Sequence, residues 1–183
     1  MKPIARYKVT IRGIRPLLMH RPPTPDEEAE EKRKKKGTTI SPHAEAERAL
    51  YKDEKGRICT PAIHIESALI SSASEFPMPG KRRKSLKEVF LAGIYVEPKM
   101  IPHKYTDWVV DIQPVRIQKG RIMRGRPRFD RWELEFTINV MDERITEDVL
   151  KEVLQNAGIS KGIGDYRPRY GLFEVVEFKE IKE

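Results

Sequence analysis

The chain has 183 residues and a net charge of +8 at pH 7, with 35% of its residues charged and a single cysteine. This length allows one domain with a substantial core, which we place over residues 1–183. No apolar run approaches the roughly 18 residues of a membrane helix, and the lone Cys59 excludes an internal disulfide and is typical of a reducing cytoplasm. The basic balance favours a polyanionic partner, and the abundance of Lys, Arg and Glu is typical of a thermophile.

The N-terminal residues alternate between apolar and polar side chains. Tyr7, Val9 and Ile11 are separated by Lys and Thr, which predicts a half-buried β-strand. The same alternation argues against a signal peptide.

Residues 22–44 interrupt this pattern as a charged insertion. Pro22, Pro23 and Pro25 break the chain at its start, and an acidic run then passes into a basic one. The run contains Glu–Lys pairs four positions apart but almost no apolar face, so it cannot pack firmly. We predict a mobile arm that is at most transiently helical. Its basic end, residues 33–36, is either a solvated charge run or a phosphate contact.

A helix is predicted over residues 62–75. Thr60 offers a capping hydroxyl and Pro61 suits the first helical position. Apolar residues recur at helical spacing from Ile65 to Phe76, and two prolines end the pattern. A compact basic loop follows, which we expect to extend a positive track: Lys81, Arg82, Arg83 and Lys84.

Two long alternating stretches, 108–117 and 131–140, predict the middle strands, and 94–96 predicts a short edge strand. Pro114 suggests an edge position or a bulge. If the long strands pair, residues 118–130 project as a basic hairpin. Its basic residues, with the one that precedes it, are Arg116, Lys119, Arg121, Arg124, Arg126 and Arg128.

The tip of this hairpin carries Ile122 and Met123, which have no core to enter. Exposed apolar residues ringed by arginine suit insertion between stacked bases while the arginines hold phosphates. The alternative is that they pack on the body of the protein or on a neighbouring subunit.

A second helix is predicted after Thr146, with an apolar stripe from Val149 to Ala157 and Gly158 as its stop. The last strand is predicted over 172–181.

A glycine-rich loop separates this helix from the last strand. Glycine allows close approach of the backbone to a ligand, arginine binds phosphate, and tyrosine stacks on bases. The candidate ligand residues are Gly162, Gly164, Tyr166, Arg167 and Arg169. The alternative is a turn whose arginines are merely solvated.

The predicted order is strand, helix, strand, strand, helix, strand. It indicates an α+β fold of the ferredoxin-like, or RNA-recognition-like, βαββαβ type, decorated by the basic hairpin and the charged insertion. This fold hosts many functions, so the fold alone does not indicate a function, and the basic hairpin and the charged insertion are the informative features.

With these elements in place, the chain resembles the RAMP superfamily of CRISPR-associated proteins, and within it the backbone subunits that polymerise along guide RNA. The stretch from Tyr51 to Leu69, the basic hairpin as a projecting thumb, and the loop from Gly162 to Val175 carry the resemblance. The chain is also similar to prophage and mobile-element proteins, through Leu17-Leu18-Met19-His20 and Gly164-Asp165-Tyr166-Arg167-Pro168.

The resemblance implies a non-catalytic subunit that binds single-stranded nucleic acid and repeats along it, alone or with other subunits of a CRISPR-like or mobile-element ribonucleoprotein. It favours RNA, although the residues alone do not distinguish RNA from single-stranded DNA. Two alternatives stay open: a metal-independent endoribonuclease, and a structural protein of a virus or mobile element.

Catalysis has two weak candidates. His20 follows the first strand and could act as a general base. Asp26 lies in the loop where cleaving members of the family carry an aspartate. Cys59 and His64 have no companions that would complete a tetrahedral metal site, and no nucleotide-cofactor motif is present, so we predict no metal and no cofactor.

Overall fold

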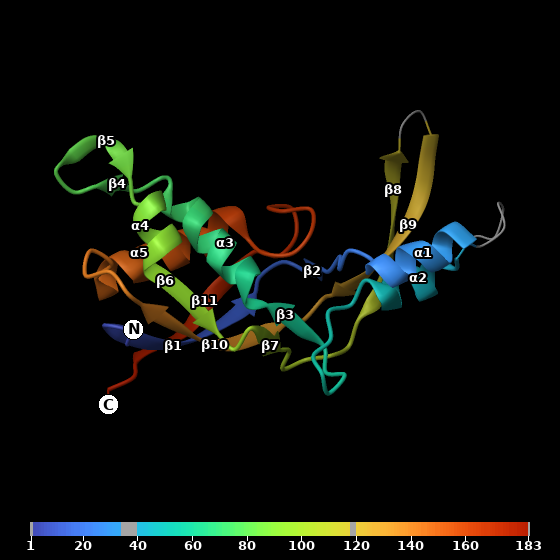
Figure 1. Ribbon diagram of the computed structural model, residues 1–183, viewed down its shortest axis with the longest axis horizontal. Helices are drawn as coiled ribbons and strands as arrows, with labels where there is room; N and C mark the ends of the chain where they lie inside the picture. Colours follow the sequence, from blue (N-terminus) through green and yellow to red (C-terminus); the bar gives the residue numbers. More distant parts are fainter. Residues whose placement is uncertain (1, 34–39, 118–119, 183) are drawn as a thin grey trace.

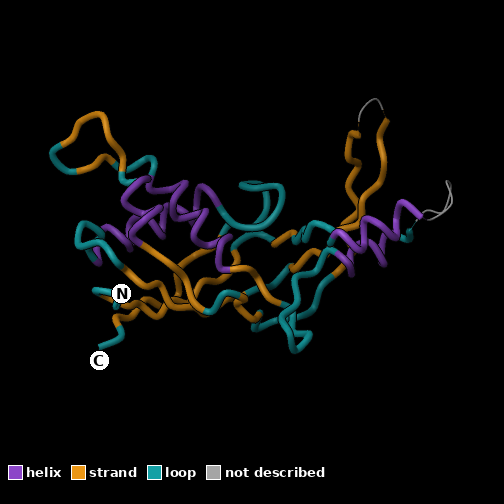
Figure 2. The backbone as a smooth tube through the Cα atoms, in the orientation of Figure 1, coloured by secondary structure: helices purple, strands orange, loops and turns teal. Residues whose placement is uncertain are grey.

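The computed structural model describes residues 2–33, 40–117 and 120–182, and it is a mixed α+β structure with antiparallel sheets (Figures 1 and 2). Its main sheet has four strands in the order β11-β1-β10-β6, and every neighbouring pair is antiparallel. These strands are β1 (Ala5–Gly13), β6 (Ile94–Glu97), β10 (Glu133–Val140) and β11 (Phe173–Glu180). The predictions of a first strand, of a short edge strand and of a closing strand are confirmed.

One face of the main sheet packs on the core. Tyr7, Val9 and Ile11 of β1 are buried, as their alternation predicts, and they lie opposite apolar residues of β10. In Figure 1 the helices cover this face of the sheet and leave the other open. The covering helices are α3 (Ala62–Ala73), α4 (Lys87–Gly93) and α5 (Glu147–Asn156).

Helix α5 forms as its sequence predicts at the start, but not at the end. The Thr146 hydroxyl accepts a hydrogen bond from the backbone N–H of Val149, and the predicted apolar stripe faces the core. Gly158 does not end the helix, because a π-helical turn, η1 (Ala157–Lys161), continues it. The stop is Gly162, whose φ of 69° lies in the region that favours glycine.

The start of α3 differs from the prediction by one position. Pro61 itself is the capping residue, and no side chain caps the helix. Thr60 instead belongs to β3 (Cys59–Pro61), which pairs with β7 (Met100–Pro102). Its hydroxyl is 2.8 Å from Nε2 of the buried His103, so a buried polar partner has displaced the cap.

The pairing predicted for the two long strands is wrong. β10 pairs with β1 and β6, whereas β8 (Val109–Ile117) pairs with β9 (Gly120–Phe129) in a separate ribbon. Two residues preceding the insertion, β2 (Leu17–Leu18), extend this ribbon to three strands. The predicted hairpin is therefore only the outer part of a longer ribbon, and Pro114 lies on its edge strand, as predicted.

Part of the charged insertion is helical. Helix α1 (Pro25–Arg33) keeps its described side chains exposed except for Glu27, which agrees with its lack of an apolar face. The predicted boundary at residue 44 falls inside helix α2 (Pro42–Arg48), and the Glu45 carboxylate of α2 accepts a hydrogen bond from the backbone N–H of Gly125 in β9. The mobility of the insertion stays a prediction.

The basic segment after α3 is not a loop. Strand β5 (Lys81–Ser85) pairs with β4 (Pro77–Met78) in a small hairpin. In Figure 1 this hairpin and the β8/β9 ribbon lie at opposite ends of the molecule, and both rise from the helix-covered side of the main sheet. Within the described residues, no helix has the length and apolar character needed to cross a membrane.

Candidate nucleic-acid interface

The glycine-rich loop packs tightly on its own chain. A Cβ added to Gly164, whose φ is 79°, would lie 2.4 Å from the carbonyl oxygen of Leu18. The next residue, Asp165, donates its backbone N–H to that same oxygen at 2.9 Å. Gly171 is similarly closed in, with Ile163 O 1.8 Å from its added Cβ. Packing within the protein therefore explains why glycine occupies these positions. Contact of Gly162 and Gly164 with nucleic acid stays a prediction.

This packing places Asp165 and Tyr166 against Arg126 of β9. Arg126 Nε lies 3.0 Å from Asp165 Oδ2, and its guanidinium carbon lies 4.8 Å from the centroid of the Tyr166 ring. The contact with Asp165 is an ion pair without the alignment of a hydrogen bond, because the same oxygen has no hydrogen-bond partner. Arg126 is only 8% exposed, so its charge is largely withdrawn from solvent.

Tyr166 combines exposure with an unusual backbone. Its side chain is 42% exposed, and its φ of 53° is positive, which bulky residues rarely adopt. Strained conformations of this kind cluster at functional sites. Tyr170 lies nearby, with its ring centroid 6.5 Å from that of Tyr166. The loop thus presents a partly open aromatic ring beside an arginine.

His20 faces the same centre. Its Nδ1 lies 3.8 Å from Asp165 Oδ2, and its side chain is half exposed. Burial, and next the positive charge of Arg126, lower the pKa of His20 below its usual value, although Asp165 acts in the opposite direction. A lowered pKa favours the neutral imidazole, which can accept a proton. The structure therefore brings one sequence candidate for catalysis to the loop.

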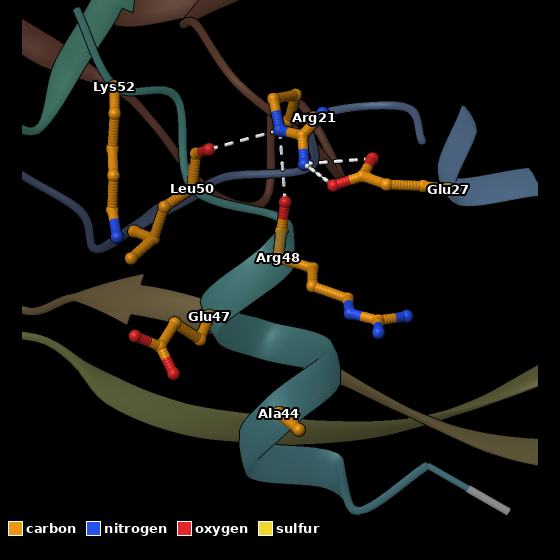
Figure 3. A pocket seen from close by; sticks show the side chains of 7 residues that line it. All are labelled: Arg21, Glu27, Ala44, Glu47, Arg48, Leu50 and Lys52. Carbon is orange, nitrogen blue, oxygen red and sulfur yellow. Dashed lines mark hydrogen bonds and ion pairs between the residues drawn. The ribbon is translucent and has the colours of Figure 1, made fainter. Parts of the chain in front are cut away.

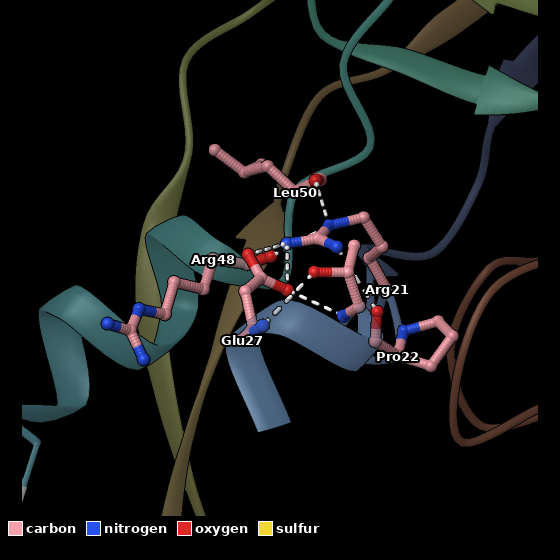
Figure 4. Close-up of polar contacts among 6 residues, drawn as sticks. Arg21, Pro22, Glu27, Arg48 and Leu50 are labelled. Carbon is pink, nitrogen blue, oxygen red and sulfur yellow. Dashed lines mark hydrogen bonds and ion pairs between the residues drawn. The ribbon is translucent and has the colours of Figure 1, made fainter. Parts of the chain in front are cut away.

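The other catalytic candidate, Asp26, is an exposed residue in the first turn of α1. Its neighbour Glu27 makes the specific contact instead: Arg21 Nη2 donates to Glu27 Oε1 at 2.8 Å and to Oε2 at 3.1 Å. These bonds hold the pKa of Glu27 at about 2. Arg21 Nε also donates to the carbonyls of Arg48 and Leu50, so it ties α1 to the segment after α2 (Figure 4).

The same arginine borders an open pocket of about 550 Å³ (Figure 3). Its lining is charged and of both signs, and it comes from the segments around α1 and α2. The residues are Arg21, Glu27, Ala44, Glu47, Arg48, Leu50 and Lys52. In Figure 3 the Arg48 side chain extends away from the Arg21–Glu27 contact.

The described arginines of β9 are engaged within the protein. Arg124 pairs with Glu45 of α2. Arg128 Nη1 donates to the buried Asp111 at 2.9 Å and its Nε donates to Asp130 at 2.8 Å, and these bonds raise the pKa of Arg128. The dense positive field expected of the hairpin is therefore partly neutralised at its base.

A second set of cations forms no ion pair with any carboxylate in the described parts of the chain. Its members are Lys81, Arg83 and Lys84 of β5, and Arg167 and Arg169 of the glycine-rich loop. Arg167 also borders a groove of about 440 Å³ that the loop forms with Ser71 and Ser160. These cations are free to attract a polyanion.

The open face of the main sheet has a different character. Most of its basic and acidic side chains contact a side chain of opposite charge or Asn139. The contacts are Arg6–Asn139, Lys8–Glu135, Arg12–Glu133, Arg12–Glu174, Lys104–Glu133, Asn139–Glu97 and Lys179–Glu177. This face lacks both the net charge and the aromatic pair by which a sheet of the RNA-recognition type would bind RNA.

Several predicted contacts cannot be placed. Lys119 lies outside the described residues, and so do the side chains of Arg82, Arg116, Arg121 and Ile122. Met123 is described, and it is 58% exposed in β9, opposite Pro114. Its exposure agrees with the prediction that it has no core to enter.

Sequence reasoning missed the carboxylates of the site. Asp165 was noted only as part of a motif. The sequence gave no indication that Glu45 and Asp111 contact arginines, because those arginines lie far along the chain or on a neighbouring strand. Tyr51 was also missed: its hydroxyl donates to the carbonyl of His20, and its ring meets that of His64 edge to face at 5.4 Å.

Known proteins give no further guidance to the site. A scan against protein-family models finds no match, and a search of curated proteins finds no relative. In the described part of the chain, no group of three or more His, Cys, Asp or Glu residues could hold a metal ion.

Proposed function

We propose that this protein binds single-stranded nucleic acid along the helix-covered side of its main sheet, RNA in preference to DNA. In this proposal it is a non-catalytic subunit that repeats along the strand in a cytoplasmic CRISPR-like or mobile-element ribonucleoprotein. The strand order β11-β1-β10-β6, with α3 and α5 as the crossover helices, supports a ferredoxin-like assignment and the resemblance to RAMP proteins.

The observation that carries the proposal is a set of cations without a carboxylate partner on the helix-covered side of the main sheet. Lys81, Arg83 and Lys84 at one end, and Arg167 and Arg169 in the central loop, have no carboxylate partner in the described residues. In Figure 1 their segments, the β4/β5 hairpin and the loop before β11, lie on the same side of the sheet as the helices. The opposite face is neutralised by internal contacts.

The chemistry of the loop suits a single strand better than a duplex. Arginine and lysine hold phosphates without regard to sequence, and an exposed ring such as that of Tyr166 stacks on an unpaired base. In a duplex the base faces are occupied by their neighbours. A protein that reads backbone and base faces in this way would coat a strand with little sequence preference.

The test is a binding titration with labelled RNA and DNA strands of about 12 nucleotides, in the range that one binding fold covers. The slope of log affinity against log salt is negative. Replacing Arg167 and Arg169 by Gln should reduce its magnitude by about 1.4, since each phosphate contact contributes about 0.7 on a single strand. The control Lys8→Gln, on the neutral face, should change neither affinity nor slope.

Coating has its own signature. Under nuclease digestion, a protein that repeats along the strand protects fragments that grow in equal steps as protein is added. Absence of strand binding at low salt would refute the proposal.

A second candidate function is a metal-independent endoribonuclease, favoured by the contact of His20 with Asp165 beside Arg126. A neutral His20 could take the proton of a 2′-hydroxyl while Arg126 stabilises charge on the phosphate. Cleavage of an RNA strand, resistance of the same strand carrying 2′-deoxy sugars, and loss of cleavage in His20→Gln would establish this function. Binding without cleavage would favour the first proposal.

A further inference from the structure

The groove of about 440 Å³ beside the glycine-rich loop lies between that loop, the last turn of α3 and the turn η1. Ser71 comes from α3, Ser160 and Lys161 come from η1, and the loop contributes residues 164–168. The lining thus combines hydroxyls, charged side chains and the ring of Tyr166. Its volume is in the range of a site for one small ligand or one unit of a longer one.

The wall formed by η1 is fixed by contacts within the protein. Ser160 Oγ donates to the carbonyl of Asn156 at 2.7 Å. The Asn156 side-chain amide donates to Ser72 Oγ at 3.0 Å and to Glu75 Oε2 at 2.9 Å. Glu75 also forms an ion pair with Lys161. These contacts join η1 to the end of α3, so this wall is held in place before a ligand binds.

Ser71 and Arg167 differ from these residues, because they are exposed and have no such partner. In the described parts of the chain, the Ser71 hydroxyl makes no hydrogen bond and Arg167 forms no ion pair. Burial, and next the positive charge of Arg167, lower the pKa of His64 in α3, so this charge acts close to the helix. A hydroxyl and a guanidinium are therefore both accessible to a ligand in one groove.

The chemistry of these free groups matches the parts of a ribonucleotide. A guanidinium binds phosphate oxygens, and the Tyr166 ring, which is 42% exposed, can stack on a base. The Ser71 hydroxyl can both donate and accept a hydrogen bond, and the 2′-hydroxyl of a ribose can do the same. A deoxyribose has no group with which to exchange that hydrogen bond, so Ser71 provides a way to distinguish the two sugars.

We propose that this groove receives one ribonucleotide of a bound strand and that the Ser71 hydroxyl recognises its 2′-hydroxyl. Arg167 holds the phosphate, and the base lies against Tyr166. The inference rests on the proposed function and adds to it the residue that makes the protein prefer RNA to DNA. In Figure 1 the loop before β11 lies beside α3, so a strand that contacts the loop also meets this helix.

The first experiment is a binding titration of the whole protein with three uridine strands of about 12 nucleotides, which carry ribose, 2′-deoxyribose or 2′-fluororibose. The fluorinated sugar keeps the conformation of ribose but cannot donate a hydrogen bond. The wild type should bind the ribose strand about threefold or more tightly than the other two, as one additional hydrogen bond allows. Equal binding of the ribose and fluororibose strands would overturn the inference, because sugar conformation would then decide.

The second experiment uses the same strands and three variants. Ser71→Ala should weaken binding of the ribose strand about threefold or more and leave binding of the deoxyribose strand unchanged. It should remain folded, because Ser71 is exposed and alanine favours the helix. The matched control Ser67→Ala lies one turn earlier on the exposed side of α3, outside the groove lining, and should change neither affinity. Arg167→Gln should weaken both strands by the same factor, because both carry phosphates.

The outcomes separate the two proposals. If the wild type prefers RNA and Ser71→Ala keeps that preference, or weakens both strands equally, the inference fails while strand binding stands. If the wild type binds both strands equally, Ser71 does not read the sugar, and the inference fails in the same way. If no strand binds at low salt, the proposed function fails and the inference fails with it.

Discussion

Two basic hairpins project from this protein, and their cations have different surroundings. In the β8/β9 ribbon, Arg124, Arg126 and Arg128 each contact a carboxylate. In the β4/β5 hairpin, Lys81 and Lys84 have no such contact in the described residues. In sequence the two segments look alike. The comparison shows that a run of basic residues can be part of the folded scaffold or a surface for a polyanion, and that the acids around it decide which.

Those acids come from remote parts of the chain. Glu45, the partner of Arg124, is 79 positions away, and Asp165 arrives on a loop near the C-terminus. The Arg124–Glu45 hydrogen bond and the Arg126–Asp165 ion pair attach the base of the ribbon to other parts of the fold. We therefore expect substitutions around the ribbon to change stability first, and substitutions of the cations in the β4/β5 hairpin to change binding alone.

The sharpest contrast is between two glycines with positive φ. Gly164→Ala should lower the free energy of unfolding by more than about 3 kcal/mol, because the added Cβ would lie 2.4 Å from Leu18 O in a conformation unfavourable for alanine. Gly80→Ala, in the turn of the β4/β5 hairpin, meets nothing within 4 Å and should cost about 1 kcal/mol. Urea unfolding measures both, and equal losses would contradict the packing described for the loop.

The next largest loss of stability should follow from substituting a carboxylate partner of the ribbon arginines. Asp111 is 5% exposed and accepts from Arg128 and Gln113, so Asp111→Ala leaves both donors short of an acceptor. We expect a loss of about 2 kcal/mol, below the range for a fully buried pair because Arg128 is partly exposed. Lys84→Ala should stay within about 0.5 kcal/mol in the same unfolding assay. A similar loss for both would remove the distinction between the hairpins.

Salt dependence of strand binding separates the same two regions. Replacing Arg83 and Lys84 by Gln should reduce the magnitude of the slope of log affinity against log salt by about 1.4. Arg128→Gln should leave the slope nearly unchanged, because that charge is bound by Asp111 and Asp130. Circular dichroism would establish that each variant is folded. A larger drop for Arg128→Gln would show that the ribbon arginines exchange their partners for phosphates.

The smallest expected effect is a pH dependence at the base of the ribbon, where His20 lies and where the β4/β5 hairpin has no counterpart. Because the pKa of His20 is lowered in the folded protein, its contribution to stability is present above pH 6.5 and is lost as pH falls through the lowered value. A bound phosphate favours the charged imidazole, so strand affinity should rise as pH falls over that window, by less than about tenfold.

This pH dependence should disappear in His20→Gln, measured by the same titration at several pH values. An unchanged profile in that variant would assign the effect to another group.

Periodicity was enough to predict the elements of the body. The alternation of β1 and β10 and the apolar stripe of α5 specify buried faces, and the structure buries those residues. Pairing was harder. Residues 108–117 alternate like a strand, but their sequence does not indicate which strand they pair with. Their partner β9 is rich in Arg, Gly and Pro, and Gly and Pro are depleted in strands. The four residues of β6 give a weak signal, although they take the place beside β10.

For the candidate site, sequence reasoning found His20, Tyr166 and the basic residues but not their relations. It attributed the loop glycines to ligand approach, whereas Gly164 and Gly171 are closed in by the carbonyls of Leu18 and Ile163. A local pattern reports which chemistry is available. It does not report which charges the fold has already used, because that depends on contacts across the chain.

The neutral open face of the main sheet also bears on how fast the protein finds its ligand. Lys81, Arg83, Lys84, Arg167 and Arg169 belong to segments on the opposite side, so, if the protein binds a polyanion as proposed, these cations would turn that side toward it before contact. Such steering raises the association rate at low ionic strength and leaves the dissociation rate almost unchanged. The paired charges across β1, β10 and β11 would then matter for encounter as well as for stability, since they keep the rear of the molecule from competing for the same strand.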